Sequence, residues 1–197
     1  MADIGFPRKS IALAQADAYY YEPDDIVCNL PKRIAHSHKG TFGRVVVIAG
    51  CDTMSGACFL SAKAAYRMGA GLVHVVSTPS NRDTLLSALP EILFSTREEI
   101  KKVLPLASAV VIGPGIGLSK QSEELVDYVL ANTKVPTVVD GDAITICAKK
   151  DIAFRDNFVL TPHVKEMSVL TGIPIPKLQE DILETCLLYT SDAADEL

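Results

Sequence analysis

Two pairs of polar residues stand at spacings that can support chemistry. Asp140 and Asp142 are two residues apart, and His163 and Glu166 are three apart. Two carboxylates so close together can hold Mg²⁺, usually through water, and an imidazole can bind a carbonyl or phosphate group or transfer a proton. The structural alternatives are that Asp142 caps a helix starting at Ala143, and that His163 is a hydrogen-bonded loop residue.

Two glycine-rich segments add backbone groups to these side chains. Residues 50–56 precede a helix whose first turn offers free N–H groups and the positive end of the helix dipole, which together attract anions. Residues 113–117 read Gly-Pro-Gly-Ile-Gly and can bring the backbone close to a phosphate or a ribose. Neither segment has the P-loop or dinucleotide-fingerprint spacing. Turn geometry alone is the alternative explanation for both.

Alternating strands and helices are expected to position these four segments. Continuous β-branched runs predict strands at residues 44–49, 72–77, 109–112, 135–139 and 158–160. Apolar residues at helical spacing predict helices at residues 57–68, 81–87, 97–103 and 120–131, and a further helix that ends at residue 170. The fold class is therefore α/β, with a mostly parallel central sheet and helices on both faces. Because ligands of such sheets bind beyond the carboxyl ends of the strands, the four segments should meet along one edge.

Composition and charge exclude several functional classes. The chain has 197 residues, of which 48% are hydrophobic and 22% charged, close to the average of globular domains. A net charge of −5 argues against nucleic acid as a partner, and no apolar run is long enough for a membrane span. The five cysteines form no C-x-x-C pair, and the first residues do not resemble a secretory signal. The expected location is the cytoplasm.

Seven short segments, taken together, resemble the ADP/ATP-dependent NAD(P)H-hydrate dehydratase family over residues 32–175. In chain order they are Ser-His-Lys-Gly-Thr-Phe-Gly-Arg-Val-Val-Val-Ile-Ala-Gly (37–50), Met-Ser-Gly-Ala (54–57), Arg-Met-Gly-Ala-Gly-Leu-Val (67–73), Leu-Pro-Glu (89–91), Gly-Pro-Gly-Ile-Gly (113–117), Val-Val-Asp-Gly-Asp-Ala (138–143) and Leu-Thr-Pro-His (160–163) followed by Glu166. Each motif is modest, but their order and spacing are highly specific. The resemblance implies the ribokinase-like fold, incomplete at the C-terminus.

The resemblance also implies a function in nicotinamide cofactor repair. In this family the hydroxyl of NAD(P)H hydrate is phosphorylated by ADP or ATP, and loss of phosphate restores NAD(P)H. The partners implied are the hydrate, an adenine nucleotide with Mg²⁺, and further copies of the chain in a homo-oligomer of the intact enzyme. Residues implied to contact the hydrate are Ala57, His163 and one of Gly115 and Gly117. Those available for phosphate or metal are Asp140, Asp142 and Glu166.

Departures from the family pattern give an expected domain organisation. Residues 2–7 resemble the closing strand of the epimerase domain of bifunctional family members, so residues 1–31 are expected to be the tail of such a domain and a linker. Residues 32–185 are expected to be part of a dehydratase domain, and residues 186–197 a non-native tail. The family's Gly-Thr-Gly-Asp segment, with the catalytic acid and the phosphate anion hole, does not occur in the sequence. The catalytic residue is therefore unknown, and a truncated, inactive fragment with an exposed sheet edge is expected.

Two other functions stay open from the sequence. One is a ribokinase-like kinase for a small molecule such as a vitamin alcohol, whose loop at residues 54–57 would differ. The other is a nucleotide-binding fragment without catalysis, which the missing aspartate favours.

Overall fold

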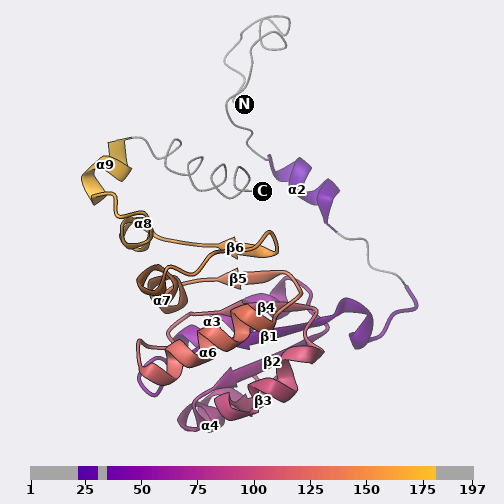
Figure 1. Ribbon diagram of the computed structural model, residues 1–197. Coiled ribbons are helices and arrows are strands. Elements are labelled where there is room, and N and C mark those ends of the chain that lie inside the picture. Colours follow the sequence, from indigo (N-terminus) through magenta and orange to yellow (C-terminus); the bar gives the residue numbers. More distant parts are fainter. Residues whose placement is uncertain (1–21, 31–34, 181–197) are drawn as a thin grey trace, which may run out of the picture. The chain divides into compact units, whose positions relative to one another are not determined.

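Figure 1 shows the chain as a computed structural model, which describes residues 22–30 and 35–180. Contacts divide the chain into two units, residues 1–37 and 38–197. In the first unit, helix α2 (Pro23–Asn29) begins with a proline, whose missing N–H costs nothing in a first helical turn. The expected epimerase tail is described only at residues 22–30, and the expected tail at residues 186–197 lies outside the described residues.

The second unit is built on a sheet of six parallel strands in the order β3-β2-β1-β4-β5-β6. The strands are β1 (Arg44–Ile48), β2 (Leu72–Ser77), β3 (Leu93–Thr96), β4 (Ala109–Ile112), β5 (Thr137–Val139) and β6 (Phe158–Leu160). The last three residues of β1 are fully buried, as expected of a central strand covered on both faces. The sheet thus places the five predicted strands next to one another, with β6 at one edge and the additional strand β3 at the other.

Helices cover both faces of this sheet. They are α3 (Ser55–Arg67), α4 (Arg82–Ala88), α5 (Ile100–Val103), α6 (Lys120–Asn132), α7 (Asp142–Lys150), α8 (Val164–Thr171) and α9 (Ile175–Glu180), with short 3₁₀ turns η1 (Lys39–Phe42), η2 (Pro79–Asn81), η3 (Arg97–Glu99) and η4 (Leu104–Leu106). Successive residues of β1 face opposite layers, because side chains alternate along a strand. Val46 and Ile48 pack with α6 and α7, whereas Val47 and Ala49 pack with α3 and α4.

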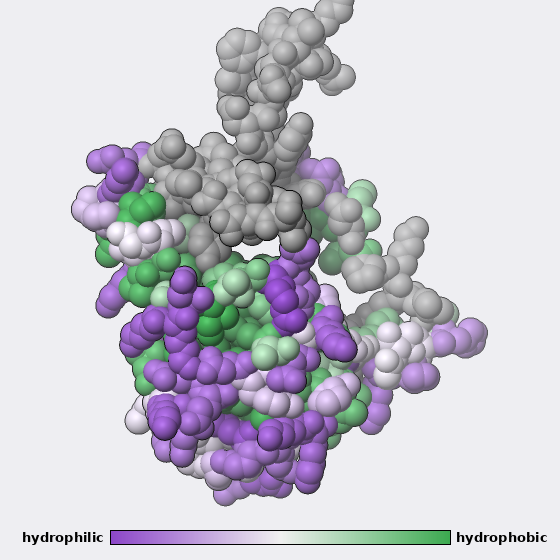
Figure 2. Space-filling model, in the orientation of Figure 1, coloured by the Kyte–Doolittle hydropathy of each residue, from purple (hydrophilic) through white to green (hydrophobic). Residues whose placement is uncertain are grey.

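The two edges of the sheet differ from its centre. β6 pairs only with β5 among the described strands, and its Val159 side chain is 57% exposed. In Figure 2, hydrophobic residues gather over the part of this unit where β5, β6, α7 and α8 lie, and hydrophilic residues dominate over β3 and α4. None of the described helices is long and apolar enough to cross a membrane.

The α/β fold class with a parallel central sheet and helices on both faces is confirmed. One strand was missed: β3 is short, and its Leu-Phe-Ser-Thr sequence is half polar. The helix predicted at residues 97–103 instead begins as the 3₁₀ turn η3 and continues as the single turn of α5. The strand predicted from residue 135 begins at Thr137, because Pro136 lacks the N–H that pairing would use.

Candidate functional site

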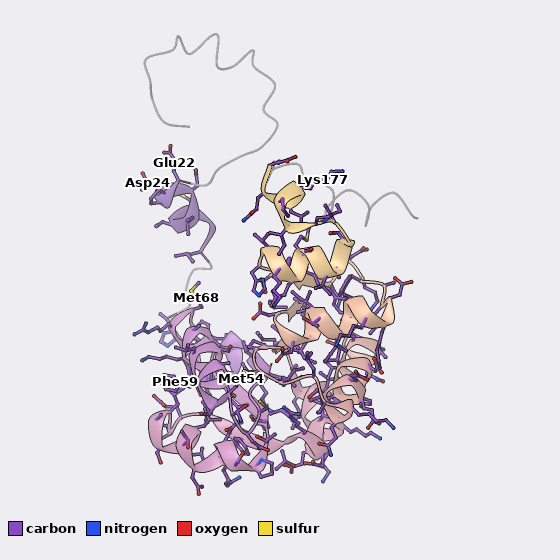
Figure 3. All side chains as sticks on the ribbon, turned by 90° about the vertical axis from the view of Figure 1, so that its left-hand side faces the viewer. Glu22, Asp24, Met54, Phe59, Met68 and Lys177 are labelled. Carbon is purple, nitrogen blue, oxygen red and sulfur yellow. The ribbon has the colours of Figure 1, made fainter. Side chains whose placement is uncertain are left out.

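The direction of the chain connections reverses between β1 and β4. From β1 the chain proceeds outward through β2 to β3, and from β4 it proceeds the other way through β5 to β6. Ligands of open parallel sheets commonly bind at such a reversal, beyond the carboxyl ends of the two central strands. The two loops here are the β1–α3 loop (residues 49–54) and the β4–α6 loop (residues 113–119). In Figure 1, β5 and β6 point toward the left-hand side, and Figure 3 views that side with Met54 labelled.

The β4–α6 loop rests directly on the β1–α3 loop. The N–H of Gly50 donates to the carbonyl of Pro114 at 2.8 Å. Gly115 has a φ of +62°, and a Cβ built there would lie 3.0 Å from the Cβ of Ala57 and from that of Met54. Only glycine fits this contact without strain. Gly115 is therefore packed against the first turn of α3, beside Ala57.

The backbone donors in the first turn of α3 have no side-chain cap. Met54 occupies the N-cap position and makes no side-chain cap hydrogen bond. A 13-residue helix carries partial positive charge at this end. Nothing lies within 4 Å of a Cβ built at Gly56, so space is open beside the turn. Together with the neighbouring glycine loop, this end of α3 is suited to an anionic group.

Asp142 holds the far end of the β4–α6 loop. Its Oδ2 accepts a hydrogen bond from the N–H of Gly117 at 2.8 Å. The N-cap of α7 is Gly141, with a φ of +54°, and Asp142 is the first residue of the helix. The idea that Asp142 caps a helix starting at Ala143 was therefore wrong, because the helix begins one residue earlier and the carboxylate reaches across to another loop.

Asp140 connects β5 to the next strand along the sheet. Its Oδ1 accepts a hydrogen bond from the Thr161 hydroxyl at 2.7 Å, which joins the β5–α7 loop (residues 140–141) to the β6–α8 loop (residues 161–163). A Cβ built at Gly113 would lie 1.8 Å from the Asp140 carbonyl oxygen, so glycine is required for this close approach. All four predicted segments are thus linked in sequence along one edge of the sheet.

His163 and Glu166 form a capping box at the start of α8. Nδ1 of His163 accepts from the N–H groups of Lys165 and Glu166, both at 3.2 Å, and the N–H of His163 donates to Glu166 Oε2 at 2.9 Å. Since Nδ1 is an acceptor, the neutral ring carries its proton on Nε2, which lies 3.1 Å from Glu166 Oε1. We call this pair the α8 cap. These contacts agree with the structural alternative for His163, a hydrogen-bonded loop residue.

One residue of the site was not predicted from the sequence. Arg97, directly after β3, donates through Nη2 to the carbonyl of Gly50 at 2.7 Å and to that of Ile116 at 2.9 Å. Burial lowers the pKa of its guanidinium, and the nearby Cys51 and Asp52 oppose that shift. The sequence could have indicated Arg97 only by its position directly after a strand, and that strand, β3, was not predicted. We call the β1–α3 loop, the β4–α6 loop and Arg97 the switch-point region.

The structure therefore brings most of the predicted site residues into one network. Gly115 contacts Ala57, Gly117 donates to Asp142, and Asp140 accepts from Thr161, which precedes His163 of the α8 cap by two residues. Among the described residues, no group of three or more His, Cys, Asp or Glu side chains could hold a metal ion.

The family model and the similar proteins of known function both point to NAD(P)H-hydrate dehydratases. Residues 45–193 match a family model described as NAD(P)H-hydrate dehydratase. The bifunctional NAD(P)H-hydrate repair enzyme Nnr of Coxiella burnetii is 39% identical over 155 residues, which are 77% of this chain and 31% of that protein.

Solved structures agree with the sequence match. A ribokinase-like superfamily protein from Enterococcus faecalis superposes with a TM-score of 0.78 at 30% identity, over 83% of this chain and 60% of that one. An ADP/ATP-dependent NAD(P)H-hydrate dehydratase from Bacillus subtilis, co-crystallised with ATP and Mg²⁺, gives a TM-score of 0.70 at 29% identity, over 80% of this chain and 57% of that one. The chain thus spans less than two thirds of the length of each of these relatives, and the expected ribokinase-like fold is confirmed.

Proposed function

The chain belongs to the NAD(P)H-hydrate dehydratase family, and from that premise we propose that the edge described above binds the hydrate of NADH or NADPH for repair. The observation that carries the proposal is the contact of Gly115 with Ala57 at the uncapped start of α3. It lies where the chain connections reverse, the usual position of a ligand in an open parallel sheet. In the whole enzyme, this binding would serve ADP- or ATP-dependent dehydration of the hydrate.

Each predicted binding residue has a role in this proposal. The missing side chain of Gly115 lets its loop pack against Ala57, and the open space beside Gly56 leaves room for a ligand close to the backbone. Donors of the first turn of α3 would face an anionic group of the dinucleotide. Gly117 is held by its hydrogen bond to Asp142 and would contact the ligand from the same loop as Gly115. His163 would offer its Nε2–H to the amide or phosphate of the ligand, in exchange for its contact with Glu166.

The acidic residues suit Mg²⁺ only as an ion that arrives with the nucleotide. Asp140 and Asp142 each have one carboxylate oxygen engaged by a protein donor, which leaves the second oxygen of each for water around an ion. Mg²⁺ is commonly held by one or two carboxylates together with substrate phosphates. When bound in this way, the ion would neutralise charge on the transferred phosphoryl group.

Turnover by this chain is not part of the proposal. The Gly-Thr-Gly-Asp segment, in which the family resemblance locates the catalytic acid and the phosphate anion hole, does not occur among the 197 residues. Loss of such a proton-transfer group lowers rates by about 10²–10⁴. We therefore limit the proposal to binding of the nicotinamide nucleotide by the residues described above.

Calorimetric titration of the full chain with NADPH, a stable relative of the hydrate, tests the proposal. Gly115→Ala should weaken NADPH binding by about tenfold or more, because its methyl would meet Ala57 and Met54. The matched control is Gly172→Ala, which has a similar φ of +71° but nothing within 4 Å of the added Cβ. This control should lose stability without losing affinity.

Two outcomes would contradict the proposal. One is no NADPH binding by the unmodified chain, with or without ADP and Mg²⁺. The other is binding of pyridoxine or a thiazole alcohol in place of NADPH, which would favour a vitamin-alcohol kinase.

A further inference from the structure

Arg97 connects elements that are far apart in the sequence. Besides the carbonyls of Gly50 and Ile116, its guanidinium reaches the Ser122 hydroxyl from Nη1 at 3.2 Å. Ser122, on α6, in turn donates to the Ile116 carbonyl at 2.7 Å. One side chain thus joins the end of β1, the β4–α6 loop and the start of α6.

These hydrogen bonds fix the direction of the peptide groups. In a trans peptide the C=O and N–H point opposite ways, so a carbonyl turned toward Arg97 turns the next N–H away from it. The peptide between Ile116 and Gly117 is gripped on both sides, by Arg97 at its carbonyl and by Asp142 Oδ2 at its N–H. The peptide between Gly50 and Cys51 is held at its carbonyl in the same way. Arg97 therefore contributes to the orientation of both loops, beside the Ser77 and Ser122 hydroxyls that donate to the same two carbonyls.

The hydrogen bonds of Arg97 go only to uncharged groups, and the carboxylates of Asp52 and Glu98 act on its charge without a hydrogen bond. Its three hydrogen-bond acceptors are neutral oxygens, and its Nε is buried with no hydrogen-bond partner among the described residues. Arginine stays protonated even when burial lowers its pKa, as it does here. Arg97 is half-buried, and each of the two carbonyls that it contacts also accepts from a serine hydroxyl, so stability alone does not call for arginine at this position.

We propose that Arg97 is a positioning residue for the ligand site: its forked guanidinium sets the separation of the β1–α3 and β4–α6 loops, and its charge favours a phosphate group bound above them. The ligand part of this inference rests on the proposed function, whereas the loop part does not. Lysine would keep the charge but not the fork, because an ammonium is a compact point charge without a planar array of donors.

Hydrogen–deuterium exchange with NADPH titration tests both parts in the full chain. Arg97→Met should increase exchange about tenfold or more in peptides covering residues 50–57 and 113–118, with residues 142–150 as an internal reference. NADPH binding should weaken by about tenfold or more, as for the loss of hydrogen bonds to a charged group. Arg97→Lys should give intermediate changes in both. The matched control is Arg82→Met, on the exposed start of α4 over the Phe94 ring, which should change neither measurement.

The outcomes separate this inference from the proposed function. Unchanged exchange in both loops of folded Arg97→Met would overturn the inference, and if that variant does not fold, unchanged loops in Arg97→Lys would do the same. Faster loop exchange with unchanged NADPH affinity would overturn the ligand part. Faster loop exchange in a chain that does not bind NADPH even unmodified would support the loop part while the proposed function fails.

Discussion

The switch-point region and the α8 cap hold their polar groups in opposite ways. In the switch-point region, Arg97 is 47 residues from its partner Gly50 and 19 from Ile116, and the Gly117–Asp142 bond spans 25 residues. In the α8 cap, the hydrogen bonds of His163 span two or three residues. The first geometry is imposed by the tertiary structure, whereas the second is a property of a short local sequence.

This difference predicts different responses to mutation. Changes in the switch-point region and at its junction with β5 should affect the whole domain, because several elements share those contacts. Changes in the α8 cap should affect mainly one helix turn beside an edge strand. The loss in the free energy of unfolding on substitution should therefore be larger where a residue contacts several elements than where it contacts one helix turn.

The largest effect is expected for Gly113→Ala. The added Cβ would lie 1.8 Å from the Asp140 carbonyl oxygen, and the φ of +123° is unfavourable for alanine. A loss of about 3 kcal/mol or more in the free energy of unfolding should follow, measured by urea denaturation. Gly56→Ala is the control, since its Cβ meets nothing within 4 Å and should change stability by less than about 1 kcal/mol. Equal costs for the two variants would contradict the close packing of these loops.

A smaller, local effect is expected for His163→Ala. Removal of the side-chain cap of α8 should cost about 1 kcal/mol and increase amide exchange in α8 more than in α6. His163→Asn should keep most of the stability, because an asparagine side chain also accepts from first-turn N–H groups. If asparagine preserves stability but weakens NADPH binding, the imidazole has a ligand role beyond capping. If His163→Ala is as stable as the parent, the α8 cap does not contribute to the free energy of unfolding.

The smallest effect is expected from the pH dependence of the β2–β3 pair. His74, in β2, lies 3.1 Å through Nε2 from the Ser95 hydroxyl, and its Nδ1 is buried without a partner among the described residues. Burial lowers the pKa of His74, the nearby Arg44 lowers it further, and Glu99 opposes both. Since the unfolded chain then binds the proton first, stability should fall as the pH drops below about 6.5 toward the folded-state pKa.

Denaturation of the parent and of His74→Gln at pH 7.5 and pH 5.5 measures this contribution. The difference between the two pH values should be smaller in the variant, which has no proton to take up at residue 74. An identical difference in both proteins would mean that protonation of His74 does not contribute to the pH dependence of stability.

Much of the fold could be predicted from the sequence because its central strands are dense in β-branched residues. β1 and β4 are such strands, and a glycine follows within two residues of each strand end. β3 could not be predicted, since two of its four residues are polar and an edge position needs less apolar surface. The positions of the site loops followed from the rule that ligands bind beyond strand ends, but the contacts within them did not.

Those contacts depend on tertiary structure that no local pattern encodes. Asp142 looked like a helix cap, yet its carboxylate accepts from Gly117, on a loop that only the fold brings near. Arg97 carried no motif, and its three acceptors are two backbone carbonyls and a serine hydroxyl. By contrast, the His163–Glu166 spacing was visible in the sequence because its hydrogen bonds lie within one helix turn.

Arg97 lies directly after β3, a strand with only one neighbour in the described sheet. Edge strands fray at lower free energy than interior ones. Partial melting of β3 on warming would withdraw the guanidinium and release both loops while the interior of the sheet is still intact. The affinity for NADPH should therefore decline at temperatures below the main unfolding transition. The temperature range in which the protein binds its ligand would then be limited by the edge strand β3 and not by the central strands.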